Sequence, residues 1–118
     1  MTTSDRYKSC DYYQMDAMRT RSIPPYDTGA MLSHAVFGLC SEAGEVAGIF
    51  QKVYQGHDVN TEHLKKELGD VLWMVAEACD ACGFSMSEVM ATNIEKLQKR
   101  YPEGFDSEHS LHRADGDV

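Results

Sequence analysis

Two pairs of acidic residues, set inside helical patterns of apolar residues, constrain this chain most. Glu42 and Glu45 form the first pair, and Glu67 and Asp70 form the second. At about 100° per residue, an apolar stripe runs along residues 29–54, and Glu42 falls in its middle. Burying a lone carboxylate is costly, so an inward Glu must be paired, protonated or bound to a cation. The pattern therefore predicts two helices whose acids face a common point.

Each pair belongs to its own stripe. The first stripe consists of Met31, Ala35, Leu39, Val46, Ile49 and Val53, and the second of Leu64, Leu68, Val71, Val75, Ala78 and Cys82. Acids three residues apart share one side of a helix, so four carboxylates can converge. They would repel one another by several kcal/mol at low dielectric unless a cation lay between them. Oxygen donors suit Mg²⁺, Mn²⁺ or Ca²⁺, and Mg²⁺ or Mn²⁺ with phosphate fits best.

Helical periodicity occurs in four segments, whereas period-two alternation is scarce, so we expect an all-α fold. The predicted helices cover residues 5–19, 29–54, 61–83 and 85–101. The third starts at Thr61 or Glu62, and the fourth opens with a capping box. Short loops make consecutive helices antiparallel neighbours, which predicts a four-helix bundle.

Length and charge narrow the class of protein. We expect one domain over residues 1–105 and a polar tail over 106–118 that is disordered or orders only on binding. The formal net charge of −8 argues against a nucleic-acid partner. We find no signal peptide and no apolar run of membrane length, and so expect a soluble, cytoplasmic protein. We therefore expect the four cysteines to be reduced, buried thiols. Metal binding or redox chemistry at Cys79-x-x-Cys82 is the alternative.

The fourth predicted helix carries an amide and two cationic side chains that could bind a ligand opposite the acids. Asn93 and Arg100 fall within its apolar stripe, and Lys96 lies on the edge of that stripe. An amide and two cations on one face are what phosphate oxygens opposite a metal cluster require.

Three further residues are candidates for substrate binding. His34 and Lys52 share the flank of Glu45, and His34 is as readily explained as a surface residue of its helix. Trp73 lies opposite the apolar stripe of its helix, which favours a subunit interface or stacking on a base.

Taken together, these motifs resemble the MazG-like all-α nucleoside triphosphate pyrophosphohydrolases. The resemblance covers residues 38–46, 65–73 and 93–105, in the family's order. Gly44 and Gly69 fit the family pattern, in which small residues let helices approach closely. Met74 departs from it, since the family often has Tyr there, and this leaves base recognition open.

The resemblance implies a MazG-type fold completed by oligomerisation, as a homodimer or homotetramer, and cleavage of a triphosphate into a monophosphate and pyrophosphate. The implied metal ligands are the four acids, and Glu45 is the residue chosen to activate water. Asn93 and Lys96, and less directly Arg100, match substrate-contacting positions. Two alternatives stay open: hydrolysis of another pyrophosphate compound such as phosphoribosyl-ATP, and a non-catalytic helical module that binds a nucleotide or a partner.

Overall fold

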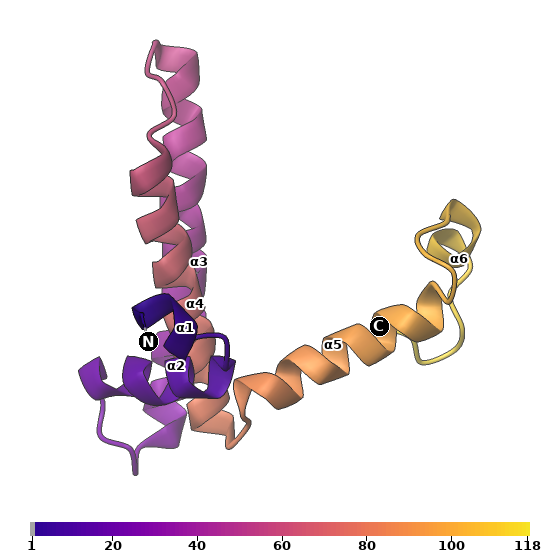
Figure 1. Ribbon diagram of the computed structural model, residues 1–118, viewed down its shortest axis with the longest axis horizontal. Coiled ribbons are helices and arrows are strands. Elements are labelled where there is room, and N and C mark those ends of the chain that lie inside the picture. The colour runs from indigo at the N-terminus through magenta and orange to yellow at the C-terminus, as the bar shows by residue number, and fades with distance from the viewer. Residues whose placement is uncertain (1) are drawn as a thin grey trace.

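The computed structural model describes residues 2–118 and is all-α over that range, as predicted, with no β-strand. Its helices are α1 (Thr3–Arg6), α2 (Cys10–Ala17), η1 (Met18–Thr20), α3 (Thr28–Gln51), η2 (Lys52–Gln55), α4 (Thr61–Cys82), α5 (Met86–Arg100) and α6 (Ser107–Leu111). Figure 1 shows α3 and α4 side by side as a long antiparallel hairpin. The short helices α1 and α2 lie at the base of this hairpin, and α5 leaves the base at a wide angle.

The prediction of one helix over residues 5–19 is wrong, because the chain breaks between Arg6 and Cys10. After the break α1 folds back along α2, and Asp16 accepts bonds from Arg6 Nε at 2.8 Å and Tyr7 Oη at 2.7 Å. Residues 6 and 16 of a continuous helix would lie about 15 Å apart, too far for this contact. These bonds lower the pKa of Asp16 to about 2.

The ends of the long helices agree with the sequence prediction. Gly56, with φ of +92°, and Gly83, with φ of +74°, follow η2 and α4 in the left-handed region that favours glycine. Ser85 and Glu88 form the predicted capping box at the start of α5.

The packed core lies at the base of the hairpin, where α2, η1, α3, α4 and α5 meet. It consists of Ala17, Met18, Met31, Ala76, Cys79 and Met86. Gln14 links α2 to the start of α5 at this junction. Its amide nitrogen donates to Phe84 O at 2.9 Å, and its amide oxygen accepts from Met86 N at 2.7 Å. All four cysteines are free thiols, but only Cys79 is buried, so the expectation of buried thiols holds for one of them.

The expectation that Trp73 faces outward is wrong. Its indole Nε1 donates to Ala17 O at 2.9 Å and to Thr20 Oγ1 at 3.1 Å, and the ring packs against the core. The apolar stripe of α4 marks only the side of the helix that packs on α3. The N-terminal segment covers the other side, so Trp73 is no longer evidence for a subunit interface.

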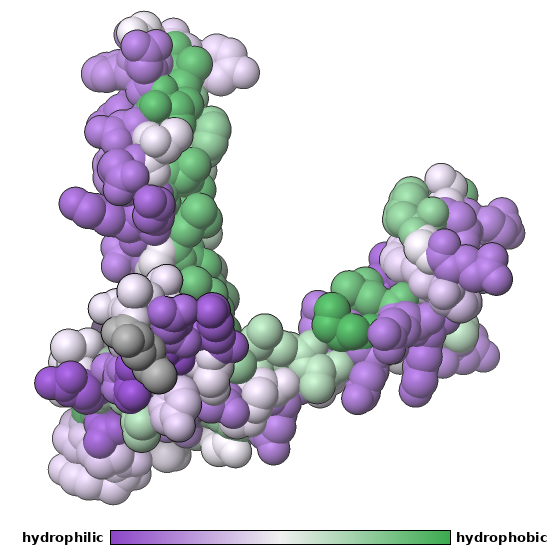
Figure 2. Space-filling model, viewed as in Figure 1, coloured by the Kyte–Doolittle hydropathy of each residue, from purple (hydrophilic) through white to green (hydrophobic). Residues whose placement is uncertain are grey.

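Within residues 2–118, the long helices do not close into a four-helix bundle. Figure 2 shows apolar side chains exposed along the hairpin and on α5. They include Leu32, Val36, Phe37 and Phe50 on α3, Leu68 and Leu72 on α4, and Met90 and Ile94 on α5. One chain therefore supplies a helical pair and a projecting helix, with much apolar surface left open.

Glycine-mediated close packing occurs at a different position from those predicted. A Cβ on Gly38 would lie 2.3 Å from Met74 Sδ, so the side chain of Met74 on α4 packs directly against the backbone of α3 there. Around Gly44 and Gly69 a Cβ would meet nothing within 4 Å. These two glycines do not allow close approach within the chain.

The segment 106–118 contains the helix α6 and contacts α5, whereas the sequence predicts a tail that is disordered or orders only on binding. Asp106 caps α6 by accepting from His109 N, and Asp117 pairs with Arg100 of α5. None of the helices in the described part of the chain is long and apolar enough to cross a membrane.

Candidate functional site

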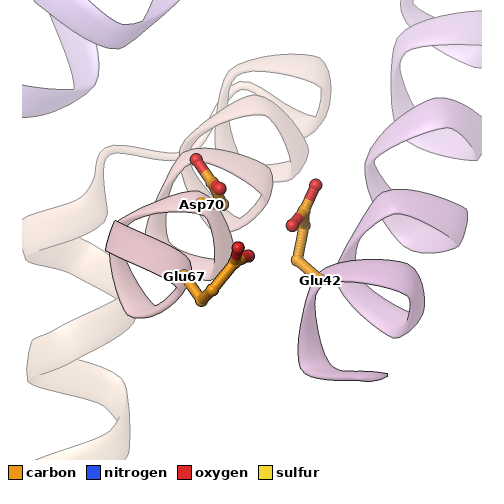
Figure 3. A group of neighbouring side chains, drawn as sticks. All are labelled: Glu42, Glu67 and Asp70. Carbon is orange, nitrogen blue, oxygen red and sulfur yellow. The ribbon is translucent and has the colours of Figure 1, made fainter. Parts of the chain in front are cut away.

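Three of the four predicted metal ligands converge in the distal part of the hairpin. Glu42 on α3 points across to Glu67 and Asp70 on α4 (Figure 3). One carboxylate oxygen from each lies within 4.8 Å of the other two. The i and i+3 spacing on α4 places its two acids on one side, and the packing of α3 against α4 brings Glu42 to them.

The charges of this acid cluster are poorly compensated. Burial, followed by the charges of Asp70, Glu67 and Glu45, raises the pKa of Glu42. A group that is harder to ionise beside other carboxylates indicates that like charges meet without a balancing cation. The cluster is therefore electrostatically suited to bind one.

The donor set fits a hard divalent cation. Its oxygens all come from carboxylates, which Mg²⁺ and Mn²⁺ prefer. Two oxygens on opposite sides of one Mg²⁺ lie about 4.2 Å apart, from a metal–oxygen distance of about 2.1 Å. Two neighbouring oxygens lie about 3.0 Å apart, so the three carboxylates, whose oxygens lie within 4.8 Å of one another, must move closer together to hold one ion directly.

Glu45 lies beside the cluster and not in it. Its side chain is exposed, and its carboxylate is not among the three that converge. Its charge still acts on Glu42, so the two groups are near each other. This position suits a group that meets solvent and substrate, but its role as ligand or base stays a prediction.

His34 and Lys52 are placed away from the acid cluster. His34 Nδ1 bonds to Glu77 Oε1 at 2.5 Å, and its ring contacts Trp73 edge to face at the base of the hairpin. Lys52 is exposed at the end of α3, ten residues beyond Glu42 and so about 15 Å further along the helix. The structure thus gives His34 contacts with Glu77 and Trp73, and its role in substrate binding stays a prediction.

The predicted phosphate-binding residues lie on α5, which diverges from the hairpin (Figure 1). Asn93 and Lys96 are exposed there. Arg100 forms a bidentate pair with Asp117. A single chain therefore does not bring the α5 residues to the acid cluster.

Sequence reasoning missed two polar residues of α4. His63 Nε2 lies 3.0 Å from Glu67 Oε1, and the i,i+4 spacing of the pair was a visible signal. Glu77 is fully buried, and its Oε2 has no hydrogen-bond partner in the described structure. Its signal was the seven-residue spacing from Asp70, which places both acids on one edge of the helix.

Comparisons with known proteins identify a matching family model and a similar phage protein. Residues 33–105 match the family model described as the MazG nucleotide pyrophosphohydrolase domain. The chain is also 35% identical over 102 residues to the "Gene 37 protein" of Mycobacterium phage L5, covering 80% of this chain and 90% of that protein. No solved structure gives a significant match.

Proposed function

We propose, because the chain belongs to the MazG nucleotide pyrophosphohydrolase family, that it hydrolyses a nucleoside triphosphate to a monophosphate and pyrophosphate with Mg²⁺ as its cofactor. The observation that carries the proposal is the convergence of Glu42, Glu67 and Asp70 from two helices. Three carboxylates at one point are costly unless they bind a cation, and nucleotide phosphates bring cations with them.

In this mechanism Glu42, Glu67 and Asp70 hold the cation. When bound, Mg²⁺ neutralises phosphate charge and lowers the pKa of coordinated water. Glu45, exposed beside the cluster, accepts the proton of the water that attacks the α phosphorus. Lys96 neutralises charge that develops on the leaving pyrophosphate.

The acids and the phosphate-binding residues lie on diverging elements, so we place the complete site between copies of the chain. A second copy packed on the hairpin would cover apolar side chains such as Val36 and Leu72, which are about half exposed. It would also bring Asn93 and Lys96 of one chain towards the acids of another. A homodimer or homotetramer is the expected state, and light scattering coupled to size-exclusion chromatography measures it.

The decisive experiment is pyrophosphate detection across a panel of canonical, deoxy and oxidised triphosphates with Mg²⁺, Mn²⁺ or EDTA. We expect activity with either metal and none with EDTA. Glu42→Gln and Glu45→Gln should each lower kcat at least about 100-fold, with helix content retained. Glu62→Gln is the matched control, because Glu62 lies on α4 but pairs with Lys65 outside the cluster.

The remaining outcomes separate the alternatives. Near-normal turnover of Glu45→Gln would remove Glu45 from the mechanism. Release of pyrophosphate only from phosphoribosyl-ATP would assign the enzyme to that substrate. Metal-dependent nucleotide binding without hydrolysis of any compound would make the chain a binding module and overturn the proposal.

A further inference from the structure

A second feature with ligand-binding character lies at the far end of α5. A pocket of about 660 Å³ separates the last turns of α5 from the segment 109–118. Four cations line it, Lys96, Lys99 and Arg100 from α5 and Arg113 from the segment, together with the acids Glu95, Asp115 and Asp117. Its volume is in the range of small-molecule sites. Cations exceed acids in this lining although the chain carries a net charge of −8, and this local excess favours an anionic ligand.

The pocket already contains an anion, the side chain of Asp117. Arg100 donates to it twice, from Nε at 2.9 Å and from a terminal nitrogen at 2.7 Å. The two side chains are only 9% and 16% exposed. A turn aims Asp117 inward: its N–H donates to Ala114 O at 3.1 Å, and Gly116 has φ of +82°, as the third position of a type II turn requires.

Three cations from two segments act on this one carboxylate. The hydrogen bond from Arg100, with the charges of Arg100, Arg113 and Lys96, lowers the pKa of Asp117. A guanidinium can donate two parallel hydrogen bonds to a phosphate as well as to a carboxylate. The same groups that hold Asp117 can therefore hold a phosphate in its place.

We propose that Arg100 and Arg113 bind the oligophosphate of the substrate in this pocket, and that Asp117 occupies the site in its absence. This inference rests on the proposed function, to which it adds Arg113 as a binding residue and Asp117 as an internal competitor. Lys96, already assigned to the pyrophosphate, connects the pocket to the rest of the site. Binding of the oligophosphate exchanges one Arg100 partner for another and releases the turn at residues 114–117.

The competition has a measurable consequence. Apparent affinity falls in proportion to the fraction of molecules in which the site is free, so removing the competitor strengthens binding. The probe is inorganic pyrophosphate, titrated calorimetrically in EDTA so that the acid cluster, lacking metal, contributes no attraction. Asp117→Asn should bind it about tenfold more tightly than the unmodified chain.

Two further variants distinguish occupancy of the site from a change in overall charge. Asp115→Asn removes one negative charge from the same turn, and we expect less than about a twofold change in affinity because Asp115 forms no pair with Arg100. Gly116→Ala retains every charge but strains the turn, since alanine disfavours a φ of +82°. It should release Asp117 and strengthen binding in the same direction as Asp117→Asn.

Arg113 is tested in the opposite direction. Arg113→Gln should weaken pyrophosphate binding about tenfold, and Arg113→Lys should lose less because the charge remains. Equal pyrophosphate affinities for Asp117→Asn and Asp115→Asn would contradict the role of Asp117 as a competitor. An unchanged affinity for Arg113→Gln would contradict the assignment of Arg113 to the binding site. Circular dichroism of each variant checks that the helices are intact.

These outcomes are separable from those of the proposed function. If the chain hydrolyses triphosphates while the Asp117, Gly116 and Arg113 variants bind pyrophosphate as the unmodified chain does, the inference fails alone. If the variants shift pyrophosphate affinity as expected but no triphosphate is hydrolysed, the anion pocket stands and the proposed reaction fails.

Discussion

The two ends of the α3–α4 hairpin differ in how completely one chain packs them. At the base, Met31 and Ala76 are at most 1% exposed, under the cover of α2 and η1. Further along, Leu68 and Phe50 are nearly half exposed, and the acid cluster lies among such side chains. Stability thus comes mainly from the base, while the open part retains the surface and charge that a ligand or second chain can use. A substitution at the base should therefore cost more stability than a matched one in the open part or on an exposed helix face.

The largest effect is expected from Met31→Ala. Met31 is the largest fully buried apolar side chain of the core, and truncating such a residue costs about 2–5 kcal/mol of unfolding free energy. Leu68→Ala is the matched control in the open part and should cost less than about 1 kcal/mol in the monomer, because half of the side chain is already in water. Urea unfolding measures both. Equal losses would show that the two ends are packed alike.

Gln14→Leu should cost about 2 kcal/mol, because it removes both bonds of the buried amide and leaves Phe84 O and Met86 N without their partner. The substitution also weakens the attachment of α2 to α5 at the junction from which α5 projects. Gln98→Leu, on the exposed face of α5, should change the unfolding free energy by no more than about 0.5 kcal/mol. A loss at Gln14 no greater than at Gln98 would contradict the role given to this junction.

The contrast between the ends also explains what the sequence could predict. The long helices and their caps follow from local rules, such as Gly56, Gly83 and the Ser85–Glu88 box. Glu67 and Asp70 lie together because their i,i+3 spacing fixes one side of α4, and the apolar stripe of α3 places Glu42 inward, towards them. The direction of α5 and the cover over Trp73 depend on contacts between segments far apart in the chain, which periodicity within one helix does not encode.

The same reason explains why the structure of the tail and the pairing of Arg100 could not be predicted. The polar composition of residues 106–118 is typical of disorder, and nothing local indicates that Asp117 pairs with a residue seventeen positions earlier. The sequence places His34 on the flank of Glu45 but does not indicate its bond to Glu77, which lies on another helix. Contacts within a helix were predictable, and contacts between segments were predictable only where charge required them.

Trp73→Phe should cost about 1 kcal/mol at the base. The ring volume is largely kept, but the indole N–H no longer reaches Ala17 O and Thr20 Oγ1. Tyr54→Phe, beyond the end of α3 and 93% exposed, removes a polar hydrogen without a measurable change. Thermal unfolding followed by circular dichroism compares them. No loss for Trp73→Phe would mean that η1 is not held by these bonds.

The smallest effect is a pH dependence whose sign differs between the ends. Bonds from Arg6 and Tyr7 lower the pKa of Asp16, near the base, to about 2. Its unfolded pKa is about 3.9, so the stability it contributes is present above that value and is lost as pH falls towards 2. Burial and neighbouring acids raise the pKa of Glu42 in the open part above its ordinary value. Its ionisation therefore opposes folding, and stability without metal falls as pH rises through that raised pKa.

Metal should reverse the contribution of Glu42. A carboxylate must lose its proton to bind a cation, so stabilisation by Mg²⁺ grows as pH rises through the pKa of Glu42. Thermal unfolding between about pH 4 and pH 7, above the range in which Asp16 titrates, tests this in EDTA and in Mg²⁺. Glu42→Gln should remove the fall in EDTA and weaken the rise in Mg²⁺, whereas Asp16→Asn should leave both slopes in place. If Asp16→Asn changed these slopes and Glu42→Gln did not, the cation would not be bound at the acid cluster. The three converging carboxylates in the open part would then need an explanation other than metal binding.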